Sequence, residues 1–160
     1  MDVKELLKRI SDNDSSLKSL HLRWINIRPD DARILAEALI RNTTLHTLDL
    51  EWNCIWSDGA CSLAEALMRN TTLRILRLKG NNIGSDGACA LAEALMRNMT
   101  LKIIDLDRKF NINVADEVIL LQALILIGFE AGGFSRLTVI SIKVVHSYQY
   151  IYSWAYSLLH

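Results

Sequence analysis

The sequence has little proline and no excess of charge of either sign. One proline, Pro29, stands among 160 residues, and glycine-rich or serine-rich linkers are missing, so no ordinary domain boundary interrupts the chain. Lysine plus arginine and aspartate plus glutamate number 18 each, which leaves no bulk positive field to hold nucleic acid or an anionic membrane. We therefore expect a single domain over residues 1–160, a monomer, with neither nucleic acid nor membrane as its partner.

A hydrophobic run long enough to span a membrane is also missing. The most apolar stretch, 118–129, has about a dozen residues, whereas a spanning helix needs about 20. Segment 1–14 is charged throughout and has no apolar core of a signal peptide. We therefore predict a cytoplasmic protein.

Residues for catalysis or metal binding are few and poorly spaced. Cys54, Cys61 and Cys89 are an odd number at spacings unlike a metal site or a disulfide set, and the four histidines form no ligand pair. The motifs G-x-S-x-G and H-E-x-x-H do not occur. The sequence therefore predicts no enzyme, no cofactor and no metal site.

What the chain does contain is a repeat. Four leucines, spaced 28 residues apart, begin the pattern L-x-x-L-x-L, with one isoleucine in the last copy: Leu17, Leu45, Leu73 and Leu101. Asparagine, isoleucine, D-G-A and L-A-E-A-L follow in the best copies. Segment 45–72 matches segment 73–100 at 19 of 28 positions. Such similarity does not arise by chance.

The repeat predicts one strand and one helix per unit. L-x-L places alternate side chains on one face of a short strand, and A-x-x-L-A-E-A-L places apolar residues along one stripe of a helix. Neither element buries its apolar side alone, so each needs the next unit stacked on it. We predict an α/β leucine-rich-repeat solenoid of about four to five repeats, a short horseshoe arc with parallel strands on its concave side and helices on its convex side. Ser57 or Asp58, and Ser85 or Asp86, are expected helix N-caps.

The repeat divides the chain into segments. In order they are an N-terminal capping helix (1–16), three regular repeats (17–44, 45–72, 73–100), a degenerate repeat (101–136) and an irregular C-terminal strand and cap (137–160). The tyrosine-rich tail after Val145 fits a capping helix, a strand or a partner-docking segment, and the sequence does not separate these. It also leaves open whether the chain is a fragment of a larger protein.

Two features that could suggest a secreted protein belong to the repeat. Asn42, Asn70 and Asn98 begin glycosylation sequons, but all three occupy one repeat position and are interpreted as part of the repeat. Cys61 and Cys89 fall at one position of neighbouring predicted helices, whose axes pack about 8–10 Å apart. A disulfide needs Cα atoms within about 7 Å, so we predict free, buried thiols.

Segments 45–72 and 73–100 resemble the ribonuclease-inhibitor-like class of leucine-rich repeats, as in the repeat regions of NOD-like receptors and in Ran GTPase-activating proteins. In that class the asparagine after the strand is expected to bond backbone groups of the turn. Asn53 and Asn81 match that position, whereas the first and fourth repeats depart from it. The resemblance implies a protein-binding scaffold.

The two most similar repeats differ mainly beside their predicted strands. Five of nine differences lie at non-leucine positions on or next to the strand, and two of them reverse a charge. Stacking the strands gives two charged columns across the concave sheet: His21, Asp49, Arg77 and Asp105 in one, and Arg23, Glu51, Lys79 and Asp107 in the next. Opposite charges alternate, so two interpretations stay open, a salt-bridge ladder that also binds a partner and a ladder alone.

Tryptophans lie beside these columns. Trp24 and Trp52 occupy equivalent positions at the ends of the first two strands, and Trp56 lies in the following loop. We interpret Trp24 and Trp52 as interface anchors, because large aromatics are frequent hot spots. The alternative is that they pack on the strand-to-helix loops and are mostly buried.

The sequence thus predicts a protein–protein interaction module. The two charged columns together with Trp24 and Trp52 are its predicted partner-binding residues. Two alternatives stay open: a regulator of a small GTPase, implied by the resemblance to Ran GTPase-activating proteins, and a structural fragment of a larger sensor protein.

Overall fold

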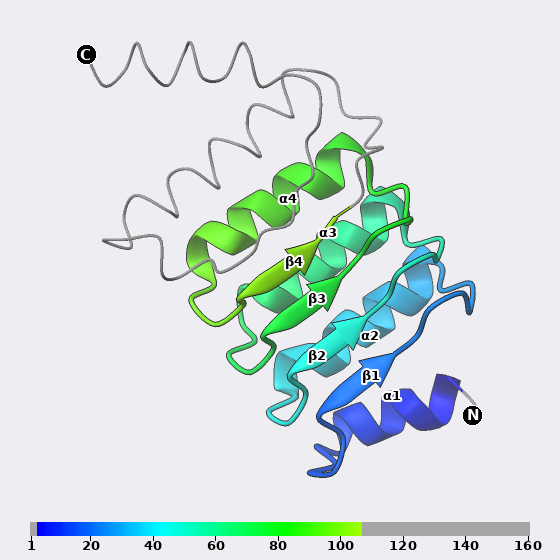
Figure 1. The fold of residues 1–160 in the computed structure, drawn as a ribbon, viewed down its shortest axis with the longest axis vertical. Coiled ribbons are helices and arrows are strands. Elements are labelled where there is room, and N and C mark those ends of the chain that lie inside the picture. The colour runs from blue at the N-terminus through cyan, green and yellow to red at the C-terminus, as the bar shows by residue number, and fades with distance from the viewer. Residues whose placement is uncertain (1–2, 107–160) are drawn as a thin grey trace.

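The computed structural model describes residues 3–106, and the structural statements below refer to that part of the chain. Helices and strands alternate along it (Figure 1): α1 (Val3–Ser11), β1 (Ser19–His21), α2 (Pro29–Arg41), β2 (Thr47–Asp49), α3 (Trp56–Leu67), β3 (Ile75–Arg77), α4 (Gly84–Arg97) and β4 (Ile103–Asp105). The predicted fifth strand and C-terminal cap lie outside the described residues.

The four strands form one parallel sheet in the order β1-β2-β3-β4. Residues that pair across neighbouring strands are 28 positions apart: Leu20 with Leu48, Leu48 with Leu76, and Leu76 with Ile104. The predicted α/β fold with parallel strands is therefore confirmed, and the strand register follows the repeat. The horseshoe arc and the total number of repeats stay predictions.

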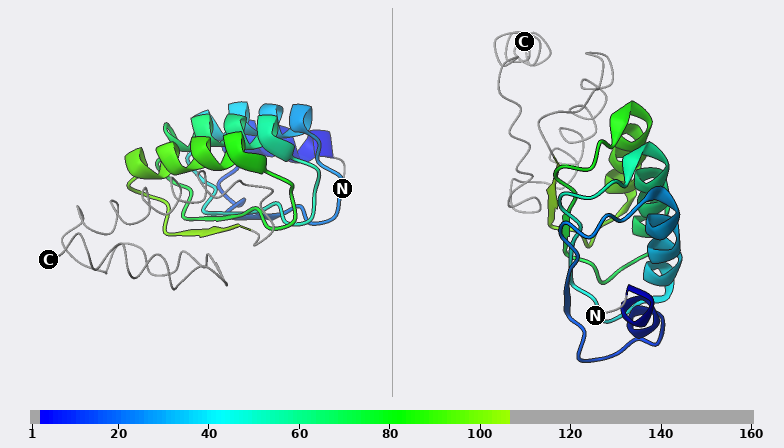
Figure 2. Two further views of the ribbon diagram at one scale, coloured as in Figure 1. Left: turned by 90° about the horizontal axis from the view of Figure 1, so that it is seen from above. Right: turned by 90° about the vertical axis from the view of Figure 1, so that its right-hand side faces the viewer.

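The structure has two layers, with the helices on one side of the sheet (Figure 2). Leucines of the strands, such as Leu48 and Leu76, are fully buried between the layers, as are Ala60 and Ala64 of α3. Burying each such leucine contributes about 1.5–3 kcal/mol, so the stacked units stabilise one another. Gly87 shows how closely the helices approach, because a Cβ there would lie 2.8 Å from the Cβ of Ala60.

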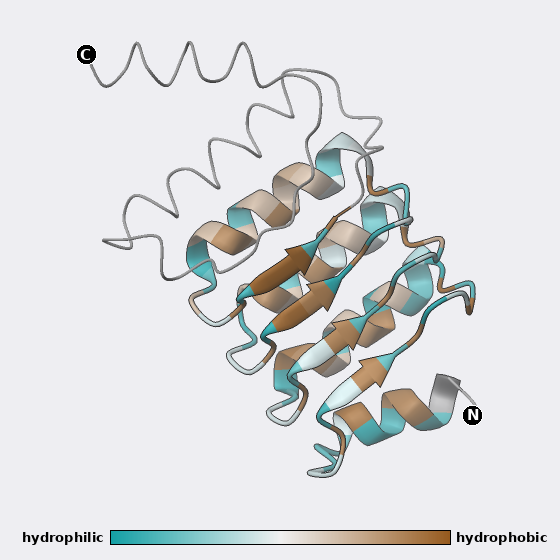
Figure 3. Ribbon diagram, in the orientation of Figure 1, coloured by the Kyte–Doolittle hydropathy of each residue, from teal (hydrophilic) through white to brown (hydrophobic). Residues whose placement is uncertain are grey.

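The open side of the sheet changes character along the stack. β3 and β4 are more hydrophobic than β1 and β2 (Figure 3). Ile75 and Ile103 stand there, in register with Ser19 and Thr47. Both isoleucines are half-buried, so the outer surface of the later strands offers apolar contact area.

Helix α1 lies in the helix layer beside α2 (Figure 2). Its Leu6 and Ile10 are buried in the common core, and Leu7 packs against that core. Asn13, just after the helix, accepts a hydrogen bond from the backbone N–H of Thr43 at 2.7 Å. These contacts suit a helix that covers the first repeat, although the division of the chain into segments stays a prediction.

Helices α3 and α4 begin earlier than predicted. The residues before them are Ile55 and Ile83, which are buried, and neither helix has a side-chain cap. The prediction of serine or aspartate N-caps is therefore wrong, since buried isoleucines fix the start of each helix. Ser57 has another partner, because its Oγ accepts a hydrogen bond from the backbone N–H of Gly87 at 3.0 Å. That bond joins α3 to α4.

Cys61 and Cys89 are less buried than predicted. Cys54, Cys61 and Cys89 form no disulfide, as expected, but each is half-buried. Cys61 lies about 100° around α3 from the buried Ala60, which puts it on the flank of the apolar stripe. Even this partial burial raises the pKa of the Cys61 thiol, with Asp86 adding to the effect.

Buried asparagines tie neighbouring repeats together after each strand. Asn53 donates to the carbonyls of Leu22 and Leu50 at 2.7 and 2.9 Å and accepts from the backbone of Ile25 and Ile27. Asn81 repeats the pattern one unit later. The role expected for Asn53 and Asn81 is therefore confirmed.

A second ladder of asparagines lies at the other end of the strands. Asn42 and Asn70 are buried, and each accepts two backbone N–H groups of the turn that leads into the next strand. The amide of Asn70 donates to the carbonyls of Leu39 and Asn42, and Asn98 continues the pattern. The sequon amides are thus structural, since both N–H groups of Asn70 are engaged inside the protein.

Candidate protein-binding surface

The predicted binding residues that the structure describes belong to the strand face. We define the strand face as the side of the sheet away from the helices (Figure 2), together with the residue directly before each strand and the three residues after it. The first predicted column is in register, with His21 opposite Asp49, Asp49 opposite Arg77, and Arg77 opposite Asp105. Asp107 of the second column lies outside the described residues.

Asp49 is the centre of the charged network. Its carboxylate is fully buried and accepts a hydrogen bond from Nε of Arg23 at 2.6 Å. His21 Nδ1 lies 3.5 Å away and Arg77 Nη1 lies 3.6 Å away. Burial by itself would raise the pKa of Asp49, but the hydrogen bonds from Arg23 and from the Glu51 backbone outweigh it and lower the pKa below its usual value. Side chains from three repeats therefore converge on one carboxylate.

Glu51 joins the same network from the second column. Its carboxylate is buried and lies 3.3 Å from Nη2 of Arg23. Burial raises the pKa of Glu51, and Arg23 opposes this effect. The side chains of Arg23 and Arg77 stay 43% and 40% exposed. The network therefore encloses its acids and presents its cations to solvent.

Two tryptophans stack at the carboxyl ends of β1 and β2. The rings of Trp24 and Trp52 lie 4.9 Å apart and are parallel to within 4°. Trp24 is 71% exposed, so the alternative of burial is wrong for it, whereas Trp52, at 39%, is partly covered and still presents apolar surface. Trp56 is 55% exposed and is the first residue of α3, where a loop was expected. We call Trp24, Trp52 and Trp56 the tryptophan edge.

The tryptophan edge has an unfavourable backbone. The φ angles of Trp24, Trp52 and Trp56 are +59°, +57° and +55°, in the left-handed region that bulky residues avoid. The equivalent positions of the next repeat are Gly80 and Gly84, at +76° and +66°. A side chain in this region costs about 1–2 kcal/mol, so the edge exposes its indoles against a conformational preference.

Gly80 also makes room for the stack. A Cβ at Gly80 would lie 2.6 Å from Cε3 of Trp52, which is closer than real contacts allow. The neighbouring Lys79 places its Nζ 5.8 Å from the centre of the Trp52 ring. The order along the edge is therefore Trp24, Trp52 and the backbone of Gly80, and Lys79 is drawn to the aromatic surface.

One column on the strand face is not among the predicted binding residues. The position after the first leucine of each repeat carries a basic residue or histidine: Lys18, His46, Arg74 and Lys102. Backbone hydrogen bonds link them in order, since the N–H of His46 donates to Lys18, that of Arg74 to His46 and that of Lys102 to Arg74. The 28-residue spacing of these four residues is the sequence signal that could have found the column.

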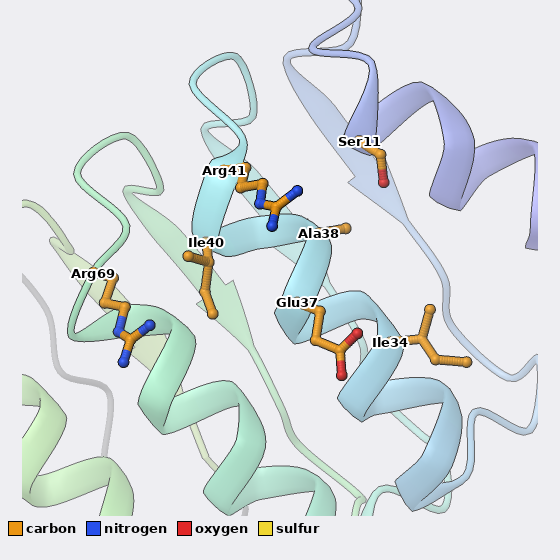
Figure 4. A pocket seen from close by; sticks show the side chains of 7 residues that line it. All are labelled: Ser11, Ile34, Glu37, Ala38, Ile40, Arg41 and Arg69. Atoms are coloured by element: carbon orange, nitrogen blue, oxygen red, sulfur yellow. The ribbon is translucent and has the colours of Figure 1, made fainter.

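The helix layer holds a separate pocket of about 490 Å³ between α1, α2 and α3 (Figure 4). It is lined by Ser11, Ile34, Glu37, Ala38, Ile40, Arg41 and Arg69. None of the predicted partner-binding residues lines this pocket. Within residues 3–106, we find no cluster of histidine, cysteine and acidic residues suited to a metal, and no helix with the length and apolar character to cross a membrane.

Comparison with known proteins places the chain in a family. Residues 1–118 match the model of the TMOD/LMOD leucine-rich domain. The chain belongs to this family. A leucine-rich family is what the repeats led us to expect, whereas the closer resemblance to NOD-like receptors is not shown. No curated protein is matched by the chain.

Solved structures support the same fold. A structure described as leiomodin-1 actin-binding site 2 is similar with a TM-score of 0.68 and 23% identity, covering 78% of this chain and 73% of that chain. The tropomodulin C-terminal domain of Caenorhabditis elegans is matched with a TM-score of 0.47 and 17% identity, covering 82% of this chain and 96% of that chain. The leiomodin match shows a shared fold. The tropomodulin match has too low a TM-score to support any further conclusion.

Proposed function

We propose that this TMOD/LMOD leucine-rich domain is an actin-binding module that contacts actin through the strand face and the tryptophan edge. Membership of the family supports a protein partner, and the leiomodin structure of similar fold is described as an actin-binding site. In this proposal the strand face is the concave side of a solenoid of four to five repeats, and the protein is a cytoplasmic monomer. The family favours actin over a small GTPase as the partner.

The observation that carries the proposal is the exposed Trp24–Trp52 stack. Large apolar side chains on a protein surface are often interface anchors. Trp24 and Trp52 are exposed on a left-handed backbone that is strained for tryptophan, whereas the repeat after Trp52 has the unstrained Gly80 at this position. Lys79 places its Nζ 5.8 Å from the centre of the Trp52 ring, and the side chains of Arg23 and Arg77 on the same strand face are 43% and 40% exposed. An aromatic centre with a charged border is the usual composition of a protein-binding hot spot.

The proposal is tested by measuring the affinity of the full chain for purified monomeric actin by isothermal titration calorimetry. Two variants change the site: Arg77→Glu with Lys79→Glu, and Trp24→Gly with Trp52→Gly. Glycine is chosen because the backbone at these positions favours it. We expect each pair to weaken binding at least tenfold, since hot-spot residues cost about 2 kcal/mol or more when removed.

The matched control removes exposed apolar groups from the helix layer. Ile34→Ala with Met96→Ala deletes side chains of comparable exposure far from the strand face, and circular dichroism checks that every variant is folded. We expect this control to bind as the unchanged chain does. An unchanged chain that does not bind actin, or site variants that bind as tightly as the control, would overturn the proposal.

A further inference from the structure

The strand face carries a net positive charge although the whole chain is neutral. Six cationic side chains lie on it: Lys18, Arg23, Arg74, Arg77, Lys79 and Lys102. Only three carboxylates oppose them within the described residues, those of Asp49, Glu51 and Asp105. Two of these, Asp49 and Glu51, are buried in contact with Arg23. A partner that approaches this face therefore meets mainly positive charge.

The excess charge is concentrated in the basic column, which we define as Lys18, His46, Arg74 and Lys102. The three cationic members are exposed, and within residues 3–106 no ion pair engages their side chains. Neighbouring strands of a sheet are about 4.8 Å apart, so three cations stand along the amino ends of β1, β3 and β4, with His46 between the first two. Like charges in a row repel one another, and an opposite charge from outside relieves that repulsion.

Apolar surface lies between the basic column and the tryptophan edge. Ile75 and Ile103, half-buried on the outer surface of β3 and β4, follow directly after Arg74 and Lys102. Trp24 follows Lys18 by six positions along the chain, which corresponds to at most about 20 Å of extended backbone. The strand face thus offers, in order, a positive row, an apolar middle and an aromatic edge.

We propose that the strand face recognises an acidic segment of its partner, with carboxylates on the basic column and an apolar side chain against the tryptophan edge. This inference rests on the proposed function, because it names the chemistry of the partner segment that the same surface accepts. A segment of six or so extended residues reaches from one feature to the other. The carboxylates neutralise Lys18, Arg74 and Lys102, and the apolar residue extends the Trp24–Trp52 stack.

Charge and shape favour an acidic protein segment over other anions. A short acidic run can lie on the basic column alone, whereas a continuous phosphate backbone laid across the sheet would also pass over Arg23, whose charge is already paired with Asp49 and Glu51. The rest of this chain is a poor occupant, since residues 107–160 contain four acidic and four basic residues. The partner segment therefore comes from another protein.

The test uses the full chain and a labelled synthetic peptide with a run of glutamates, a short Gly-Ser spacer and two leucines, followed by fluorescence anisotropy. The same peptide with lysines in place of the glutamates controls for charge sign. We expect the glutamate peptide to bind, the lysine peptide not to bind, and binding to weaken as salt is raised. The triple variant Lys18→Gln, Arg74→Gln, Lys102→Gln should weaken binding about tenfold, which corresponds to about 1.4 kcal/mol.

A matched triple variant separates the site from net charge. Arg41→Gln, Arg69→Gln, Arg97→Gln removes three charges of the same sign, at one repeat position at or just after the ends of α2, α3 and α4. We expect it to bind the glutamate peptide as the unchanged chain does, with circular dichroism showing that both variants are folded. Equal loss in both triple variants, no binding of the peptide, or binding of anionic lipid vesicles in its place would overturn the inference.

The outcome is separable from that of the proposed function. Actin affinity that depends on Trp24 and Trp52 but not on the basic column would support actin binding and reject the recognition of an acidic segment. Peptide binding without actin binding would support the acidic segment and reject actin as the partner.

Discussion

Repeats 45–72 and 73–100 share the same fold and nearly the same helix, yet their strand faces differ. Asp49 and Glu51 in the former become Arg77 and Lys79 in the latter, and Trp52 and Trp56 become Gly80 and Gly84. The left-handed backbone at the last two positions is present in both repeats. These two repeats therefore share the backbone conformation, and the residue placed on it decides between an unstrained turn and an exposed indole.

The same comparison explains the charges. The acids of the earlier repeat lie beside Arg23 on one side and Arg77 on the other, so the reversal of charge between repeats brings partners together on neighbouring strands. A repeat protein gains these contacts only where consecutive units differ. Variation between repeats thus serves the internal network as well as any partner.

The largest expected loss of stability comes from replacing Asn53, and it should exceed the loss from replacing Asn81. Asn53→Ala leaves the carbonyls of Leu22 and Leu50 and two backbone N–H groups without their partners. Because each buried polar group left unpaired costs about 1–3 kcal/mol, we expect a loss of about 3 kcal/mol in the free energy of unfolding. Urea denaturation measures it. Asn81→Ala should lose less, because it frees one backbone N–H group rather than two and that bond is long at 3.4 Å; equal losses would contradict this account.

Gly80 and Gly84 should differ although both have positive φ. Gly80→Ala brings a methyl group against the Trp52 ring, and we expect a loss of about 2 kcal/mol, from clash and backbone strain together. Gly84→Ala has space around it, with Ser57 at 3.9 Å, and should lose about 1 kcal/mol. In a chain that carries Trp52→Ala, the Gly80→Ala loss should fall to the Gly84→Ala value. A loss at Gly80 that is independent of Trp52 would reject the stacking explanation.

Removal of Arg23 should change the acid stability, because it takes the shortest hydrogen bond from the fully buried carboxylate of Asp49. The pKa of Asp49 is lowered in the folded protein, so its ionised form adds stability at pH values above its unfolded pKa of about 3.9, and this is lost as pH falls through the folded pKa. Arg23→Gln should make that acid dependence shallower in urea denaturation at several pH values. Asp14, with a pKa lowered to about 2 by hydrogen bonds from Ser16 and Arg9, titrates in both proteins and cancels in the comparison. An unchanged pH profile would exclude Arg23 as the cause.

The smallest expected effect concerns the strain at Trp56. At an ordinary surface position alanine is as stable as glycine or more so, but at a φ of +55° glycine has the advantage. We therefore expect Trp56→Gly to be more stable than Trp56→Ala by about 1 kcal/mol. Thermal and urea unfolding of the two variants measure the difference. The reverse order would show that the left-handed backbone costs nothing there.

Much of the fold could be predicted from the sequence because the repeat fixes spacing. The 28-residue period determines which strand residues face one another, so the register of His21, Asp49 and Arg77 follows from the spacing alone. The turn asparagines could be assigned from their family position. The first residues of the helices could not be predicted. The buried Ile55 precedes α3 although Ser57 has the higher preference for a cap, because core packing outweighs capping preferences.

The sequence identified residues of the candidate site, but it did not predict which of them are buried and which are exposed. The sequence places Asp49 and Arg77 in one column, yet it does not tell that Asp49 becomes fully buried while the Arg77 side chain stays partly exposed. Burial depends on how long side chains such as Arg23 fold across the sheet, and that is set by the neighbouring strands. The exposure of Trp24 and Trp52 could not be predicted either. Glycine is the residue that signals a left-handed turn in a sequence, and here tryptophan occupies those positions.

The most direct test of the central claim measures stability and actin affinity together in Trp24→Gly with Trp52→Gly. If the tryptophan edge is kept for binding, actin affinity falls at least tenfold while the free energy of unfolding changes by less than about 1 kcal/mol, because relief of backbone strain offsets the lost ring stacking. A loss of several kcal/mol in stability with actin affinity unchanged would contradict the claim and make the tryptophans part of the scaffold.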